Sequence, residues 1–343
     1  MALVIDNKKI ESILELVQGS KKVLILAHMN PDGDAIGSML GLAHLLKKNA
    51  GFADEDLFLL LPNVCPESFR FLPGSERIIC ADTQLELCQK AFEETDLIIG
   101  VDFNNTTRIG RLQELVEQSM KPKILIDHHH GPDQERFSPI VSVVDLSSTC
   151  ELIYWLCNAC WGTNGLSSET ARCLYTGICT DTGSFAYANE SSSLYEAASE
   201  LVKHDIGPAE IHNEIFNDFS VNRMQFFGYC ISERLRIFED KGFAYFYISQ
   251  QDQQKFSVKE SDTEGLVNYT LMMRNIHVGA LVKELKDKVR ISFRSKKDFD
   301  VNTYARTYFS GGGHTKASGA TSTLNFQDTL EKLEETMLEE LSR

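Results

Sequence analysis

Short apolar runs alternate with amphipathic segments through the first half of the chain. Four runs of aliphatic residues have the length of buried strands: Val23–Ala27, Leu57–Leu61, Leu97–Val101 and Ile124–Ile126. Between and after them, apolar residues recur at helical spacing in Ala35–Lys48, Ser147–Cys160 and Ser168–Cys179. Uninterrupted apolar strands separated by helices are typical of a parallel sheet that is covered on both faces. The pattern predicts an α/β fold with a mostly parallel sheet flanked by helices.

The second half has a different pattern. Glu190–Asp218 reads as helical and polar on one face, with a break at Gly207-Pro208. Further elements are expected after it: a helix at Val221–Glu239, strands at Phe243–Ile248, Val278–Glu284 and Val289–Arg294, and a helix at Phe326–Leu341. A chain of 343 residues exceeds the size at which one core usually stops growing. We therefore predict an α/β domain at residues 1–189, a helical linker at 190–219 and a smaller mixed α/β domain at 220–343, with a ligand cleft between the domains.

Charge narrows the possible partners. The formal net charge of −15 argues against a protein that coats long double-stranded nucleic acid, since such binding needs a basic surface. Residues 274–316 depart from this balance, with ten Lys and Arg against four Asp and Glu. This local excess favours a small anionic ligand, although a solvated strand face would look the same. No apolar run reaches the roughly 20 residues of a membrane span, and the N-terminus lacks a signal-peptide pattern, so we expect a cytoplasmic protein without membrane contact.

The nine cysteines have no regular spacing. One pair, Cys157 and Cys160, has the C-x-x-C spacing, but it falls in an apolar segment that reads as a buried helix. A zinc site would need a second pair at a suitable distance, and none follows. We therefore expect reduced thiols packed in the core.

Candidate chemistry lies where three of the predicted strands end. His28, Asp32 and Asp34 follow the first strand, Asp102 follows the third, and the Asp127-His128-His129 segment follows the fourth. Ligands of open α/β sheets bind at the carboxyl ends of parallel strands, so these side chains should meet in one crevice. Imidazole and carboxylate together suit divalent ions such as Mn²⁺. For Asp34 alone, capping of the following helix remains an alternative.

These segments resemble the motifs of the DHH phosphoesterase superfamily. His28–Ser38 is similar to its first motif, Val101-Asp102 to its second, Asp127–His129 to the motif that names it, and Thr180–Phe185 to its fourth. Ser292–Ser295 and Gly311–His314 resemble motifs of the DHH-associated substrate domain. The motifs occur in the family's order over nearly the whole chain. The two-domain length resembles the subfamily of nanoRNases and 3′-phosphoadenosine 5′-phosphate phosphatases, which includes exopolyphosphatase-related proteins.

The resemblance implies a site for two divalent ions, most simply Mn²⁺, with Mg²⁺ and Co²⁺ as alternatives. One ion would be held by His28 and Asp32, and Asp102 would bridge the two. The other ion would be held by Asp34, His128 and Asp181. The chemistry would be in-line attack of water on a phosphate ester. His129 would donate to the scissile phosphate, and Asp127 would orient the neighbouring histidines.

The resemblance also implies a phosphate grip in the second domain, made by Arg294, Ser295 and His314. Read physically, Gly311, Gly312 and Gly313 leave the backbone open, so their N–H groups could form an anion-binding nest, with a plain flexible turn as the alternative. One position departs from the subfamily pattern. Ala186 stands where a basic residue is expected, so a contact to phosphate or base is either missing or supplied from elsewhere, with Arg108 and Tyr187 as candidates.

The expected function is hydrolysis of very short oligoribonucleotides such as pApA, and of 3′-phosphoadenosine 5′-phosphate. Hydrolysis of cyclic di-AMP and of polyphosphate or pyrophosphate are alternative activities. A nucleotide-binding module without catalysis is the alternative outside enzymes. The sequence leaves the oligomeric state open, and a homodimer is among the possibilities.

Overall fold

The computed structural model describes residues 5–186, 191–217 and 219–342. The chain folds into two compact units, Met1–Asp218 and Phe219–Arg343. The end that we expected for the first domain, Asn189, lies outside the described residues. Within the segment that we expected to be a linker, helices α7 (Ser192–Val202) and α8 (Pro208–Phe216) belong to the first unit. They pack there against the two helices α5 (Thr149–Trp161) and α6 (Ser168–Asp181).

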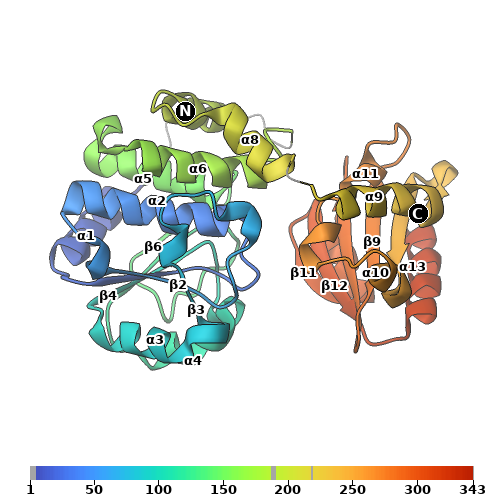
Figure 1. The fold of residues 1–343 in the computed structure, drawn as a ribbon, viewed down its shortest axis with the longest axis horizontal. Helices are drawn as coiled ribbons and strands as arrows, with labels where there is room; N and C mark the ends of the chain where they lie inside the picture. Colours follow the sequence, from blue (N-terminus) through green and yellow to red (C-terminus); the bar gives the residue numbers. More distant parts are fainter. Residues whose placement is uncertain (1–4, 187–190, 218, 343) are drawn as a thin grey trace. The chain divides into compact units, whose positions relative to one another are not determined.

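The first unit is built on a six-stranded parallel sheet with the order β3-β2-β1-β4-β5-β6. Its strands are β1 (Val23–Leu26), β2 (Leu57–Leu61), β3 (Ile79–Cys80), β4 (Leu97–Val101), β5 (Lys123–Asp127) and β6 (Ile140–Ser142). Helices α1 (Asn7–Gln18), α2 (Gly33–Ala50) and α5 cover one face, with α6 packed on α2 and α5, and α3 (Ala81–Glu94) and α4 (Gln113–Gln118) cover the other (Figure 1). The predicted α/β fold with a mostly parallel sheet is confirmed.

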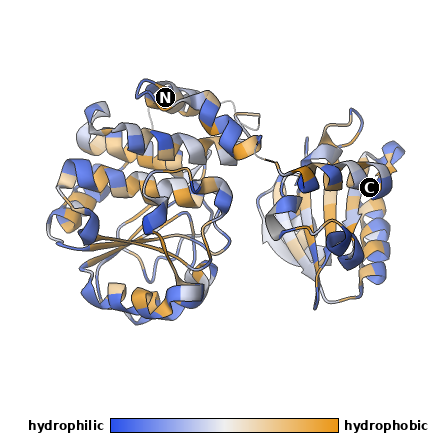
Figure 2. Cartoon of the chain, viewed as in Figure 1, coloured by the Kyte–Doolittle hydropathy of each residue, from blue (hydrophilic) through white to orange (hydrophobic). Residues whose placement is uncertain are grey.

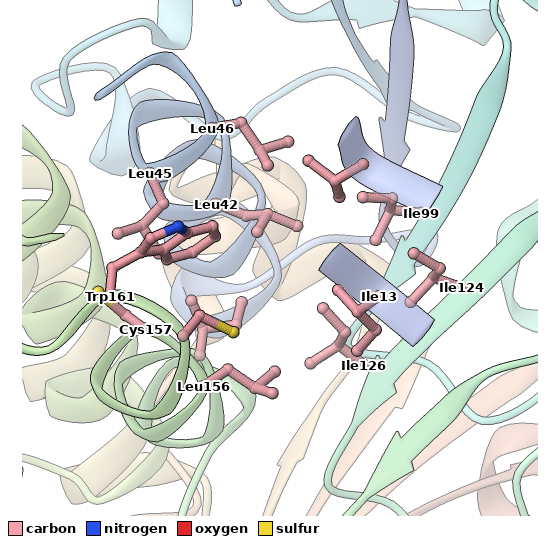
Figure 3. A pocket seen from close by; sticks show the side chains of 13 residues that line it. Ile13, Leu42, Leu45, Leu46, Ile99, Ile124, Ile126, Leu156, Cys157 and Trp161 are labelled. Atoms are coloured by element: carbon pink, nitrogen blue, oxygen red, sulfur yellow. The ribbon is translucent and has the colours of Figure 1, made fainter. Parts of the chain in front are cut away.

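Burial explains why the central strands are apolar along their whole length. Every residue of β1 and β4 is buried, because helices shield both faces of the sheet. Figure 2 shows the hydrophobic strands enclosed by helices whose outer faces are hydrophilic. A small cavity of about 30 Å³ remains beneath α1 (Figure 3). Its walls are apolar side chains such as Ile13, Leu46, Ile99 and Trp161, so it offers no groups for binding a phosphate.

Helices α2 and α6 approach each other unusually closely, because α2 carries glycine at every fourth position: Gly33, Gly37 and Gly41. A Cβ atom on Gly37 would lie 2.5 Å from the carbonyl oxygen of Cys173 in α6. Likewise, a Cβ atom on Gly33 would lie 2.4 Å from the side chain of Thr180. This contact brings the first turn of α2 beside the last turn of α6.

The second unit contains a mixed six-stranded sheet with the order β11-β12-β10-β9-β8-β7. Its strands are β7 (Leu235–Phe238), β8 (Phe243–Ile248), β9 (Val278–Glu284), β10 (Val289–Ser295), β11 (Ser310–Gly313) and β12 (Ala317–Ser322). Only the pair β8 and β9 is parallel among the described strands of this sheet. One face packs on α12 (Val301–Tyr308) and α13 (Phe326–Glu340), and the other on α9 (Val221–Glu233) and α11 (Asn268–Leu271), while α10 (Gln250–Lys255) is hydrogen-bonded to the end of β9. The predicted second, mixed domain is confirmed.

One predicted element is wrong. The helix expected at Val221–Glu239 ends at Glu233, and Leu235–Phe238 forms strand β7, which pairs antiparallel with β8. The short Leu-Arg-Ile-Phe sequence fits a helix or a strand equally well. Pairing with β8 favours the strand. It satisfies the N–H and C=O groups along the edge of β8, which a continued helix would leave unpaired.

Two smaller predictions concern the cysteines and the membrane. All nine cysteines are free thiols, and Cys157 is buried in α5 as the sequence suggested. No helix among the described residues is long and apolar enough to cross a membrane.

Candidate metal centre

The three predicted strand-end motifs lie together because their strands are neighbours in the sheet. Strands β1, β4 and β5 are adjacent and parallel, so their carboxyl ends share one edge. His28 follows β1, Asp102 follows β4, and Asp127 ends β5 with His128 directly after it. Topology alone therefore brings one side chain from each motif to the same place.

Asp102 occupies the centre of this group. Its Oδ2 lies 3.2 Å from Nε2 of His28, and its Oδ1 lies 3.7 Å from Nε2 of His128. The residue has a φ of 61° and is 1% exposed. A non-glycine residue in this left-handed region stores strain, and such residues gather at functional sites. The two carboxylate oxygens thus face different histidines, which is the arrangement that a bridging ligand requires.

His28, Asp32 and Asp102 form the first group that could hold a metal ion. Nδ1 of His28 lies 2.9 Å from the carbonyl oxygen of Met29, which directs Nε2 toward the carboxylates, 3.8 Å from Oδ1 of Asp32. Asp32 also caps α2, since its Oδ1 accepts the backbone N–H groups of Asp34 and Ala35. The N-cap of α2 is therefore Asp32 and not Asp34, the alternative considered from the sequence.

Asp34, His128 and Asp181 form the second such group. Nε2 of His128 lies 3.9 Å from Oδ2 of Asp34 and 3.4 Å from Oδ2 of Asp181. Nδ1 of His128 faces the carbonyl oxygen of Leu146 at 3.4 Å, which orients the ring. Asp181 is the last residue of α6, and the close contact between α2 and α6 is what brings it near Asp34.

The first turn of α5 donates hydrogen bonds to the carboxylates of this site. The backbone N–H groups of Thr149 and Cys150 donate to the two oxygens of Asp34 at 2.7 and 2.9 Å. The hydroxyl of Thr149 donates to Oδ1 of Asp102 at 3.0 Å. Sequence reasoning missed Thr149. The Ser148–Glu151 segment has the pattern of a helix start, which would have located the turn but not its contact with Asp34.

Electrostatics indicate a site for cations. Burial raises the pKa of both Asp34 and Asp181, and the neighbouring carboxylates raise it further. Burial would also raise the pKa of Asp102, but the contact with His28 holds it well below its usual range. For His28, burial is outweighed by Asp102 and Asp32, which raise its pKa to about 9. Carboxylates crowded in this way repel each other, and a divalent cation would relieve that repulsion, so the residues fit a metal.

His129 lies beside the metal groups and is held by Asp127. Its Nδ1 lies 2.7 Å from Oδ1 of Asp127, and its backbone N–H donates to Oδ2 of the same residue at 3.1 Å. Asp127 is fully buried. His129 also forms a possible ligand group with Asp102 and His128. The Asp127–His129 contact fixes the ring, as the predicted orienting role of Asp127 requires.

Arg108 lies near the same edge of the sheet. Its carbonyl oxygen accepts the backbone N–H of Met29 at 2.7 Å, which supports the first motif. Its positive charge opposes the rise in the pKa of His28 and of Asp181. The other candidate to replace the basic residue missing at Ala186 was Tyr187, which lies outside the described residues.

The glycines of the second unit do not form the expected nest. Gly311, Gly312 and Gly313 run as the edge strand β11 beside β12. A Cβ atom on Gly311 would lie 2.4 Å from the carbonyl oxygen of Gly319, so close strand pairing explains the glycine there. The backbone N–H of Gly313 donates to Oδ1 of Asn302. The extended backbone points successive N–H groups to opposite edges of the strand, which a nest cannot do.

The other predicted phosphate ligands lie near the ends of β10 and β11. Arg294 is half-buried on β10, and one of its Nη atoms donates to the carbonyl oxygen of Phe293. Ser295 is buried, and its hydroxyl donates to the carbonyl oxygen of Phe299 at 2.7 Å. His314 is exposed in the turn between β11 and β12. Phosphate binding by these residues stays a prediction.

Two family models match the chain. The one described as the DHH family, N-terminal domain, matches residues 22–178. The DHHA1 domain matches residues 240–341. The first match spans the sheet with the candidate metal groups, and the second spans most of the unit with the glycine strand.

Relatives match over almost the whole length. The probable bifunctional oligoribonuclease and PAP phosphatase NrnA of Streptococcus mutans is 30% identical over 317 residues, which are 91% of this chain and 93% of that protein. The crystal structure of an exopolyphosphatase-related protein from Bacteroides fragilis superposes over all of both chains, with a TM-score of 0.94 and 32% identity. RecJ of Thermus thermophilus in complex with Mn²⁺ shares the fold at 14% identity, with a TM-score of 0.57 over 98% of this chain and 55% of that one.

Proposed function

Because the chain belongs to the DHH family and is a hydrolase acting on phosphate esters, we propose that its substrates are very short oligoribonucleotides and 3′-phosphoadenosine 5′-phosphate. The name of the Streptococcus mutans relative, an oligoribonuclease and PAP phosphatase, supports both substrates. The overall charge of −15 supports a short substrate, because a long polyanion would be repelled.

The reaction would use two divalent ions, with Mn²⁺ as the preferred metal. The observation that carries this proposal is the position of Asp102, whose two oxygens face the histidines of two different ligand groups. His28 and Asp32 would hold one ion, and Asp34, His128 and Asp181 the other. Bound ions of this kind lower the pKa of water and offset charge at the phosphate.

The protein's own groups would complete the site. His129, oriented by Asp127, would donate a hydrogen bond to the phosphate oxygen on which charge develops. Arg108 adds positive charge close to the ligand groups. In the second unit, Arg294 and His314 would bind a terminal phosphate, since a guanidinium fork matches phosphate oxygens. The strand Gly311–Gly313 would let the substrate approach the backbone closely.

The proposal is tested by turnover on a substrate panel with Mn²⁺ and with EDTA. The panel contains pApA, a long RNA, 3′-phosphoadenosine 5′-phosphate, cyclic di-AMP and polyphosphate. We expect Mn²⁺-dependent cleavage of pApA and of the bisphosphate, with the long RNA almost untouched. Turnover of polyphosphate alone, or of cyclic di-AMP alone, would overturn the substrate assignment.

A further inference from the structure

Thr149 touches the carboxylates of both candidate metal groups at once. Its backbone N–H donates to Oδ2 of Asp34 at 2.7 Å, and its hydroxyl donates to Oδ1 of Asp102 at 3.0 Å. All three residues are buried. A buried carboxylate depends strongly on each hydrogen bond it receives, because water cannot replace a lost donor.

The hydroxyl of Thr149 acts on one particular oxygen of Asp102. Oδ2 is drawn toward His28 at 3.2 Å, whereas Oδ1 faces His128 at 3.7 Å. His128 and His129 also face Oδ1, at 3.7 and 3.8 Å, but the Thr149 hydroxyl at 3.0 Å is the nearest donor described on that side. The Thr149 hydroxyl holds Oδ1 on the side of the second group.

Thr149 is itself firmly placed. It is the first residue of α5, capped by Ser148, whose hydroxyl accepts the backbone N–H of Glu151 at 3.0 Å. Its own N–H and that of Cys150 bind Asp34, and a β-branched side chain on a helix has few rotamers. The hydroxyl therefore has little freedom to leave Asp102.

We propose that Thr149 is a positioning residue that keeps Asp102 turned so that each of its oxygens serves a different metal ion. The inference rests on the proposed two-ion function and adds to it a residue that no metal contacts. Loss of the hydroxyl would loosen the bridge between the ions while leaving every predicted ligand in the chain.

Thr149→Val is the direct test, because it removes the hydroxyl but keeps the shape and the N–H that binds Asp34. Thr176→Val is the matched control, since Thr176 is equally buried and its hydroxyl binds only the carbonyl oxygen of Arg172 within α6 among the contacts described. Mn²⁺ binding is measured by titration calorimetry, and coupling between the two ions by electron paramagnetic resonance. Neither readout needs a substrate or turnover.

We expect Thr149→Val to weaken Mn²⁺ binding by about 10- to 100-fold, the range for lost partners of metal ligands, and to reduce the spin-coupled signal of an ion pair. Thr149→Ser should restore both, and Thr176→Val should match the unmodified protein. If Thr149→Val does not fold, as judged by circular dichroism, Thr149→Ala compared with Thr149→Ser tests the same hydroxyl.

Two results would overturn the inference, and they are distinguishable. If the unmodified protein binds two coupled ions and Thr149→Val does the same, Thr149 has no positioning role while the proposed function stands. If the unmodified protein binds fewer than two ions, the two-ion function fails first and the role of Thr149 falls with it.

Discussion

The two units of the chain place their candidate functional residues in different surroundings. In the first unit, side chains predicted from separate motifs approach one another within hydrogen-bonding or metal-binding reach, with Asp102 at the centre. In the second unit, the predicted glycine nest is an edge strand, and the hydroxyl of Ser295 donates to the backbone carbonyl oxygen of Phe299. The sequence motifs therefore located a cluster of candidate ligands in the first unit, whereas the glycine motif of the second unit forms a strand.

The two units differ in what their strand-end side chains contact. In a parallel sheet, every strand end that carries a motif lies at the same edge, so order along the chain translates into proximity. In the second unit, the two motifs also reach one end of the sheet, because β10 and β11 both pair antiparallel with β12, but Arg294 and Ser295 donate there to nearby backbone carbonyl groups. Variants of residues in the two units should therefore differ in what they change, metal-dependent chemistry in the first and substrate binding in the second.

The largest effect is expected for Asp102→Ala. Removing the shared carboxylate should lower kcat by more than about 10³-fold, which corresponds to about 4 kcal/mol. The reason is that both candidate ligand groups lose a neighbour, and His28 loses its closest carboxylate. Steady-state kinetics on pApA with saturating Mn²⁺ measures this effect. Glu11→Ala, an exposed change on α1, serves as the control. Activity within tenfold of the unmodified protein would refute the central role of Asp102.

Asp127→Asn should have the next largest effect. The variant keeps the shape of the side chain but weakens the contact that orients His129. We expect kcat to fall by about 10²- to 10³-fold, as for loss of one well-placed donor, with Mn²⁺ binding unchanged. Asp133→Asn, at another buried carboxylate of the same unit, should leave kcat unchanged. Loss of Mn²⁺ binding in Asp127→Asn would instead make Asp127 a metal ligand.

A smaller effect, on binding, is expected in the second unit. Arg294→Ala should raise KM for pApA by about 10- to 100-fold, the range for a lost hydrogen bond to a charged group, with little change in kcat. Arg290→Ala is the matched control, because it lies four residues away on the same face of β10. An ester without a terminal phosphate should be hydrolysed equally well by both variants. If Arg294→Ala lost as much activity on that ester as on pApA, a phosphate-binding role for Arg294 would be contradicted.

Secondary structure that depends on a short stretch of sequence was predicted, whereas structure that depends on contacts between distant residues was missed. Strands β1, β2, β4 and β5 and the helix expected at Ser168–Cys179 follow directly from apolar patterns, whereas the short strands β3 and β6 were not predicted. The role of Thr149 could not be predicted, because Asp34 precedes it by 115 residues and only folding joins them. Strand β7 was misread for the same reason, since its partner β8 decides its structure.

The smallest effect on the metal site is expected from a change in the glycine spacing of α2, compared with a glycine change in the second unit. Gly37→Ala should destabilise the protein by about 1–3 kcal/mol, because its Cβ would lie 2.5 Å from the carbonyl oxygen of Cys173. Gly228→Ala, in the interior of α9 in the second unit, meets no atom within 4 Å and should stabilise the protein by up to about 1 kcal/mol. Thermal denaturation measures both changes. Separation of α2 from α6 would also move Asp181 away from Asp34, so Gly37→Ala should weaken Mn²⁺ binding and Gly228→Ala should not. Equal Mn²⁺ affinities in the two variants would mean that the ligands tolerate this displacement.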